Sequence, residues 1–343
     1  MINLQKLSVG RPTDGVGSGM LKQHSVSVLA AMGLCAVLAS CAEAPVRQDA
    51  GACLDPNTPP DRAIEECTRL IQSRQGETSF LTSAYFARAY AWERKQDIDR
   101  ALSDYGEVIR LDPLDFNAYY NRGSLLKGYK HDFARAITDL DEAIRLNPRF
   151  ANTYINRGVA HHLSGHHEQA ISDYSAALRV SPNHSLAHYN RGIVYFSLGK
   201  FAQAAEDEKI ALERVSAPFD GYAMLLRYLA RVRSGESSLV GAAQKELTES
   251  SAKGGNRGWP FPIIDFYLGR SDEQALRSHI RDANPRQRVW SCDIDFHLAE
   301  WYLLTGATTR ATSLLRAVTA DCPSSDDNYW AARNELQRIM QGR

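Results

Sequence analysis

Three copies of one five-residue stretch decide the fold of this chain: YYNRG at 119–123, YINRG at 154–158 and HYNRG at 188–192. Their glycines lie 35 and 34 residues apart, and Pro113, Pro148 and Pro182 recur at the same two intervals. A fixed period of this length indicates paired helices, because each proline ends the second helix of its pair. An earlier copy, YFARA at 85–89, brings the number of expected pairs to four.

The small and bulky residues of these pairs recur in a spacing that resembles the tetratricopeptide repeat (TPR). We number each repeat so that the small residue of its first helix is position 8, which is held by Ala89, Gly123, Gly158 and Gly192. Position 20, where the second helix crosses the first closely, is held by Ala101, Ala136, Ala170 and Ala204, with one extra residue in the turn of the second repeat. The bulky position 24 holds Tyr105 and Tyr174. The resemblance implies an all-α, right-handed superhelical solenoid of αα-hairpins with a concave groove.

The four repeats cover 61–215 when the helical stretch 61–75 is counted as a half-repeat before them. The remainder, 216–343, has helical periodicity without a clear consensus until a final TPR-like hairpin and a capping helix at about 326–340.

The N-terminal stretch indicates export. The apolar run 26–38 has 13 residues, too few for a membrane span of about 20 but enough for the core of a signal peptide. The tetrapeptide LASC at 38–41 resembles the lipobox of bacterial lipoproteins, which implies cleavage before Cys41 and acylation there, palmitate included. We therefore expect a signal peptide at 1–40, with Met20 as a possible start, and a linker at 41–60. Ala42 favours the outer membrane, facing the periplasm. The alternative is an ordinary signal, or a buried apolar helix, with a chance cysteine.

Four cysteines remain besides Cys35 and Cys41, and an even number in an exported chain suggests two disulfides. Three pairings are possible, and sequence distance favours Cys53–Cys67 with Cys292–Cys322. The alternative is two pairs of inert core thiols.

Two stretches near the C-terminus, WPFPIIDFYLG at 259–269 and FHLAEWYLLTG at 296–306, resemble the C-terminal half of the new lipoprotein I (NlpI) family. This resemblance implies a non-catalytic outer-membrane adaptor that brings a periplasmic protease to peptidoglycan hydrolases.

The same inner position of three successive repeats, position 6, carries an asparagine: Asn121, Asn156 and Asn190. Asn both donates and accepts hydrogen bonds, so a ladder of amides can hold an extended peptide backbone. Position 5 adds apolar contacts in the same groove, chiefly from Phe86, Tyr120 and Tyr189. The alternative is that the amides bond within the stack and the rings belong to the core.

Two further patterns have structural interpretations. Position 7 is Arg and position 23 is Asp in all four repeats, which predicts a structural ladder of ion pairs: Arg88–Asp104, Arg122–Asp139, Arg157–Asp173 and Arg191–Asp207. The HHLSGHH stretch at 161–167 has the residues of a metal site, but its place at a helical turn favours a polar turn.

Composition narrows the function further. The 343 residues carry 40 basic and 40 acidic side chains, which argues against a dedicated nucleic-acid binder. No nucleophile elbow, zinc-protease helix or phosphate-binding loop is present, so we expect no enzyme, cofactor or metal. The sequence thus predicts a periplasmic adaptor for proteins or peptides in envelope assembly or in the control of peptidoglycan hydrolases and proteolysis. The alternatives are an assembly factor for a secretion or pilus system, and an enzyme with an unrecognised site.

Overall fold

The computed structural model describes residues 51–73, 77–214, 220–235, 239–253, 259–280 and 285–342. The described part is helical and contains no strand, which confirms the predicted all-α fold of stacked hairpins. It divides between Lys130 and His131 into two compact units, which we call the N-terminal unit (51–130) and the C-terminal unit (131–342).

The N-terminal unit contains α3 (Pro60–Ser73), α4 (Thr78–Arg94), α5 (Ile98–Leu111), α6 (Phe116–Leu125) and the π-helix η1 (Leu126–Lys130). α4 and α5 form the first repeat, and α6 with η1 forms the first helix of the second. Asp97 and Asp115 cap α5 and α6 by accepting hydrogen bonds from backbone N–H groups of the first turn, as expected of Asp at a helix start.

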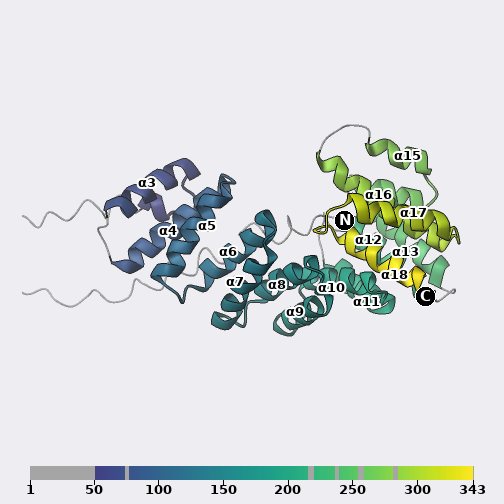
Figure 1. Ribbon diagram of the computed structural model, residues 1–343, viewed down its shortest axis with the longest axis horizontal. Helices are drawn as coiled ribbons and strands as arrows, with labels where there is room; N and C mark the ends of the chain where they lie inside the picture. Colours follow the sequence, from purple (N-terminus) through teal and green to yellow (C-terminus); the bar gives the residue numbers. More distant parts are fainter. Residues whose placement is uncertain are drawn as a thin grey trace, which may run out of the picture. The chain divides into compact units, whose positions relative to one another are not determined.

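In the C-terminal unit, α7 (Phe133–Leu146) is followed by the repeat helices α8 (Ala151–Leu163), α9 (His167–Val180), α10 (Ser185–Ser197) and α11 (Phe201–Arg214). The less regular remainder contains α12 (Asp220–Arg233), α13 (Leu239–Lys253), α14 (Phe261–Tyr267), α15 (Glu273–Arg277), η2 (Ser278–Ile280), α16 (Pro285–Leu304), α17 (Thr308–Asp321) and α18 (Asp327–Met340). One continuous core of buried residues runs from Ala151 in α8 to Ala332 in α18. Within this unit, α16 contacts α12, α17 and α18, and Figure 1 shows these helices close to one another.

The extra residue of the second repeat lies inside its first helix, not in the turn that follows. The turn residue with positive φ comes seven places after position 8 in the first, third and fourth repeats, at Gln96, Gly165 and Gly199. In the second repeat it comes eight places after, at His131. The π-helix η1 accounts for the difference, because i→i+5 bonding accommodates one more residue per turn. The boundary between the two compact units comes directly after η1. The sequence had instead indicated a division at 215, where the regular repeats end.

Three of the four predicted ion pairs join helices of one unit, and the structure confirms these three. The distances are 2.7 Å for Arg88–Asp104, 2.5 Å for Arg157–Asp173 and 2.8 Å for Arg191–Asp207. Each guanidinium donates two hydrogen bonds to its carboxylate, which is 7% exposed or less. Partly buried bidentate pairs fix geometry as well as charge, so they hold the two helices of a repeat in register. In the second repeat, Arg122 and Asp139 belong to different units.

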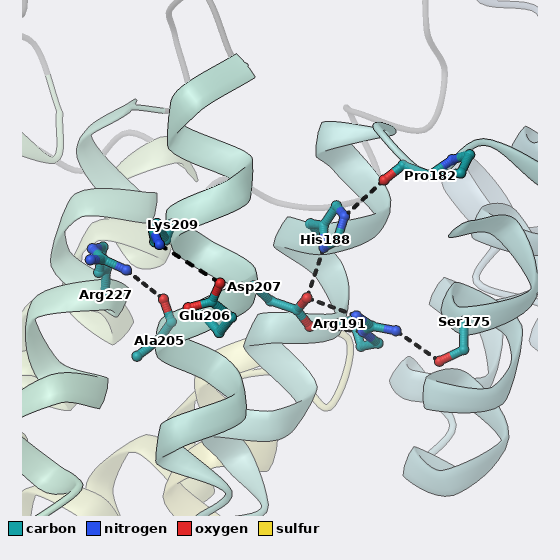
Figure 2. A network of polar contacts seen from close by, with 9 residues as sticks. All are labelled: Ser175, Pro182, His188, Arg191, Ala205, Glu206, Asp207, Lys209 and Arg227. Atoms are coloured by element: carbon teal, nitrogen blue, oxygen red, sulfur yellow. Dashed lines mark hydrogen bonds and ion pairs between the residues drawn. The ribbon is translucent and has the colours of Figure 1, made fainter. Parts of the chain in front are cut away.

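The fourth repeat extends its ion pair into a wider polar network, which Figure 2 shows. Asp207 also lies 2.8 Å from Nδ1 of His188, and Arg191 donates a further hydrogen bond to Ser175 in the neighbouring repeat. The network joins α10 to both α11 and α9, so the same side chains set the stacking of one repeat on the next.

Both predicted disulfides are confirmed. The Cα–Cα distances are 4.9 Å for Cys53–Cys67 and 6.0 Å for Cys292–Cys322, within the usual range. The first bond corrects one boundary: 51–60, assigned to a linker, is part of the folded unit. Arg94 donates hydrogen bonds there to the carbonyls of Pro56 and Thr58.

Among the described helices, none is both long and apolar enough to cross a membrane.

Candidate functional site

The inner positions of the N-terminal unit surround a hydrogen-bonded chain of three side chains. Asn121, at position 6, donates Nδ2 to the hydroxyl of Tyr105 over 3.2 Å. The Tyr105 hydroxyl in turn donates to the carboxylate of Glu93, at position 12 of the preceding repeat. Asn121 therefore bonds within the stack, as the alternative interpretation held. Its half-buried amide still has an oxygen that accepts no hydrogen bond from the described residues.

Aromatic side chains border this chain and remain partly exposed. Phe86 packs edge-on against Tyr105, with ring centroids 5.4 Å apart, and Tyr120 stacks on Phe116 at 6.0 Å. Tyr90, at position 9 of the first repeat, is also half-buried. We call Phe86, Tyr90, Tyr120 and Asn121 the N-terminal inner face. Its rings and amide offer apolar contact and hydrogen bonding together, which suits a polypeptide ligand.

The equivalent positions of the C-terminal unit are covered in this structure, so the predicted groove there is not open. Asn156 and Asn190 are 2% and 1% exposed, and Tyr189 is 2% exposed. An open groove would leave these side chains accessible to solvent. We call Ile155, Asn156, Tyr189 and Asn190 the C-terminal inner face, and in this conformation no ligand reaches it.

The cover comes from the chain's own C-terminal helices. Asn328, at the start of α18, donates to Asp293 of α16 over 2.7 Å, and Asp327 lies 3.2 Å from Nε2 of His162 in α8. The Trp330 ring meets His167 edge-on at 5.3 Å. Further along α18, Arg338 donates to the carbonyl of Ser197 at the end of α10. α18 thus serves as more than the predicted terminal cap, because it lies across two repeats.

Two glycines make room for this cover. A Cβ atom on Gly165 would lie 2.6 Å from the Trp330 ring, and one on Gly199 would lie 3.1 Å from Arg338. Both glycines also have a positive φ, a backbone conformation that residues with a Cβ atom rarely adopt. The two turns therefore suit the close approach of α18 as well as their own conformation.

The histidine-rich stretch is not the solvated polar turn that we expected. His162 is fully buried, and its Nδ1 lies 3.1 Å from Nδ1 of His167. Within the described residues, no group of three or more His, Cys, Asp or Glu side chains is placed to hold a metal ion.

Sequence reasoning missed the ionisable residues at position 12. The first three repeats carry Glu93, Lys127 and His162 there, and the last two are fully buried. Burial raises the pKa of Glu93 to about 7 and lowers the pKa of Lys127 to about 7. The sequence alone could have indicated these residues, because position 12 holds an ionisable side chain in each of the first three repeats.

The lipidation residue Cys41 lies outside the described residues, so the structure adds nothing to that prediction. The remaining groups on both inner faces are amides, hydroxyls and rings, which bind and orient. Glu93 accepts a hydrogen bond from the Tyr105 hydroxyl.

Family comparisons agree with the repeats. The model of the ETO1 C-terminal domain matches residues 57–191, and the model of the tetratricopeptide repeat matches residues 164–220. Together with the hairpins and their period, these matches support tetratricopeptide repeats over residues 57–220. TPR proteins bind peptides or other proteins, and the TPR fold is typically a non-catalytic scaffold.

Several solved structures are similar to this chain. MamA from Desulfovibrio magneticus RS-1 is 21% identical over 49% of this chain and 92% of its own, with a TM-score of 0.44. PilF of Pseudomonas aeruginosa is 14% identical over 62% of this chain and 92% of its own, with a TM-score of 0.47. YrrB, described as a TPR protein with an unusual peptide-binding site, is 15% identical over 61% of this chain and 100% of its own, with a TM-score of 0.48.

The raised pKa of Glu93 predicts a pH-dependent stability of the N-terminal unit. The cause is burial, which the hydrogen bond from Tyr105 offsets in part. Because the folded-state pKa lies above the unfolded value of 4.5, the contribution of Glu93 is full below pH 4.5 and is lost as the pH rises through about 7. Glu93→Gln keeps an acceptor for Tyr105 and should stabilise the unit at pH 8 by about 2–3 kcal/mol, with little effect at pH 4.5.

Hydrogen exchange of α4 and α5 peptides in a urea series at both pH values measures this difference. Glu77→Gln, at an exposed position before α4, is the matched control. Equal effects of the two substitutions at pH 8 would show that burial does not perturb Glu93.

Proposed function

We propose that this chain is an exported, lipid-anchored adaptor that binds protein or peptide partners through the N-terminal inner face. The observation that carries the proposal is the contrast between the two faces: Tyr90, Tyr120 and Asn121 are half-buried, whereas Asn156, Tyr189 and Asn190 are covered. Partly exposed aromatic rings beside a polar amide are typical of binding hot spots.

The geometry of this face favours a polypeptide over a small molecule. Glu93 holds the Tyr105 hydroxyl, which accepts a hydrogen bond from the Asn121 amide nitrogen. This chain of hydrogen bonds fixes the orientation of the Asn121 amide oxygen. A backbone N–H of a bound chain can donate to that oxygen while its side chains contact Phe86, Tyr90 and Tyr120. A preorganised acceptor binds with less loss of side-chain freedom than a mobile one.

Export and anchoring rest on separate features. The LASC tetrapeptide at 38–41 provides a site for lipidation, and the two disulfides are characteristic of chains that fold in an oxidising compartment. An anchored adaptor of this kind faces the periplasm from the outer membrane. The resemblance of 259–306 to the NlpI family extends the proposal to partners in envelope assembly, such as a protease and peptidoglycan hydrolases.

Site-specific photo-crosslinking tests the binding face. A benzophenone amino acid at Tyr90 of the anchored protein should give covalent adducts with a discrete partner in intact cells. The same amino acid at Leu114, which is 68% exposed in the loop after α5, is the matched control and should give few. Tyr90→Ala with Tyr120→Ala should weaken binding of the captured partner at least tenfold, because each ring supplies buried contact. Adducts at Leu114 alone, or unchanged affinity, would place the binding site elsewhere.

Cys41→Ser should block lipidation and leave unprocessed precursor, which intact-mass measurement and detergent partitioning detect. Cys35→Ser, within the apolar run, is the control and should be processed normally. A Cys41→Ser protein with the mass and partitioning of the unsubstituted chain would show that Cys41 carries no lipid.

A further inference from the structure

The fourth repeat buries an acidic side chain at a position that holds an uncharged side chain in the other three. Position 24, on the second helix of each repeat, is Tyr105, Leu140 and Tyr174 in the first three repeats and Glu208 in the fourth. All four side chains are fully buried. Glu208 therefore places a carboxyl group where its counterparts bring a ring or an aliphatic chain.

The surroundings of this carboxyl group do not suit a negative charge. Neither Oε1 nor Oε2 of Glu208 has a hydrogen-bond partner among the described residues. Its Oε1 lies directly against the backbone of α10 at Gly192, where a Cβ atom would overlap it. A carboxylate without partners costs far more to bury than a neutral carboxyl group, so this geometry favours the protonated form.

Arg227 of α12 is the cation that acts on Glu208, and it is engaged elsewhere. Its guanidinium donates one hydrogen bond to the carbonyl of Ala205 over 2.6 Å, which Figure 2 shows, and another to the carboxylate of Glu246 in α13. Arg227 would have to give up these bonds to pair with Glu208. It therefore does not neutralise a charge there.

The neighbouring acid on α11 adds repulsion. Asp207 accepts two hydrogen bonds from Arg191 and lies 2.8 Å from Nδ1 of His188, so both cationic side chains of α10 are directed at Asp207 (Figure 2). Its negative charge disfavours a second one on Glu208 beside it.

These effects act on Glu208 in the same direction. Burial, and after it the charge of Asp207, raises the pKa of Glu208 well above its ordinary value of 4.5, and Arg227 offsets only part of the increase. Tyr189 of α10 also interacts with Glu208, but burial raises its own pKa, so it stays neutral and supplies no charge.

We propose that Glu208 is a pH switch built into the C-terminal unit. While its carboxyl group carries a proton, the crossing of α10 and α11 stays closed; when the proton passes to water or hydroxide, the new charge weakens this crossing and loosens the fourth repeat. The inference concerns the C-terminal unit and does not depend on binding at the N-terminal inner face.

The direction of the pH dependence follows from linkage. The folded-state pKa of Glu208 lies above the unfolded value of 4.5, so its contribution to stability is complete below pH 4.5. That contribution is lost as the pH rises through the folded-state pKa. The fourth repeat is therefore tighter in acidic surroundings than in alkaline ones.

Infrared difference spectroscopy of the full chain tests whether Glu208 holds its proton. The spectrum of the unsubstituted chain minus that of Glu208→Gln at pH 6 should contain the C=O band of a protonated carboxyl group. Glu206→Gln, at an exposed position of the same helix, is the matched control, and its difference spectrum should lack this band. A carboxylate band for Glu208 at pH 6 would overturn the proposal.

Hydrogen exchange, expressed as protection factors at pH 6 and pH 9, tests the switch itself. Glu208→Gln keeps the shape of the protonated side chain and cannot ionise. Its α10 and α11 peptides should match those of the unsubstituted chain within about twofold at pH 6 and be at least tenfold better protected at pH 9, since each unit of pKa shift is a factor of ten. Glu206→Gln should follow the unsubstituted chain at both pH values.

Glu208→Leu repeats the measurement with the residue that the second repeat carries at this position, and it should also retain protection at pH 9. If both variants lose as much protection as the unsubstituted chain, Glu208 is not a switch. Failure of both to fold would show that the carboxyl group is required for packing at any pH, which also contradicts the proposal. Changes in α4 and α5 peptides arise from Glu93 and are read separately.

Discussion

The close approach of the two helices of each repeat is the constraint on which the rest of the structure depends. A Cβ atom on Gly158 would lie 2.7 Å from the Tyr174 ring, and one on Gly192 would lie 2.3 Å from the Glu208 carboxylate. Position 8 must therefore be small, so that the helices can meet and the Arg–Asp pairs on their flank can close. Ala89 and Ala101, both fully buried, meet the same requirement in the first repeat. Once the hairpins are fixed, their stacking determines which side chains face inward.

The inner surface that results is used differently in the two units. In the N-terminal unit, Tyr105 and Asn121 satisfy each other and leave the aromatic rings around them partly exposed. In the C-terminal unit, α16 and α18 cover the equivalent residues without satisfying all of them. One repeat sequence thus provides a partly exposed inner face in the N-terminal unit and a covered one in the C-terminal unit.

The sequence predicted the parts of this structure that depend on short-range periodicity. The spacing of Gly158 and Gly192 located the repeats, and recurrence of Arg and Asp located the ion pairs, because both are properties of a single hairpin. The disulfides followed from sequence distance alone. The cover did not, since contacts such as His162 with Asp327 and Ser197 with Arg338 join residues far apart in the chain and follow no period. Burial of Asn156 and Asn190 was missed for that reason, and the π-helix at 126–130 was missed because one extra residue can be placed in a helix or in a turn.

The central claim is that the two inner faces differ in access, and hydroxyl-radical footprinting of the full, unsubstituted chain tests it most directly. Tyrosine oxidation can be read residue by residue by mass spectrometry. The account predicts that Tyr90 and Tyr120 are modified readily, whereas Tyr174 and Tyr189, which are 0% and 2% exposed, are protected. Oxidation of Tyr189 at the rate of Tyr90 would contradict it, because the C-terminal inner face would then be open.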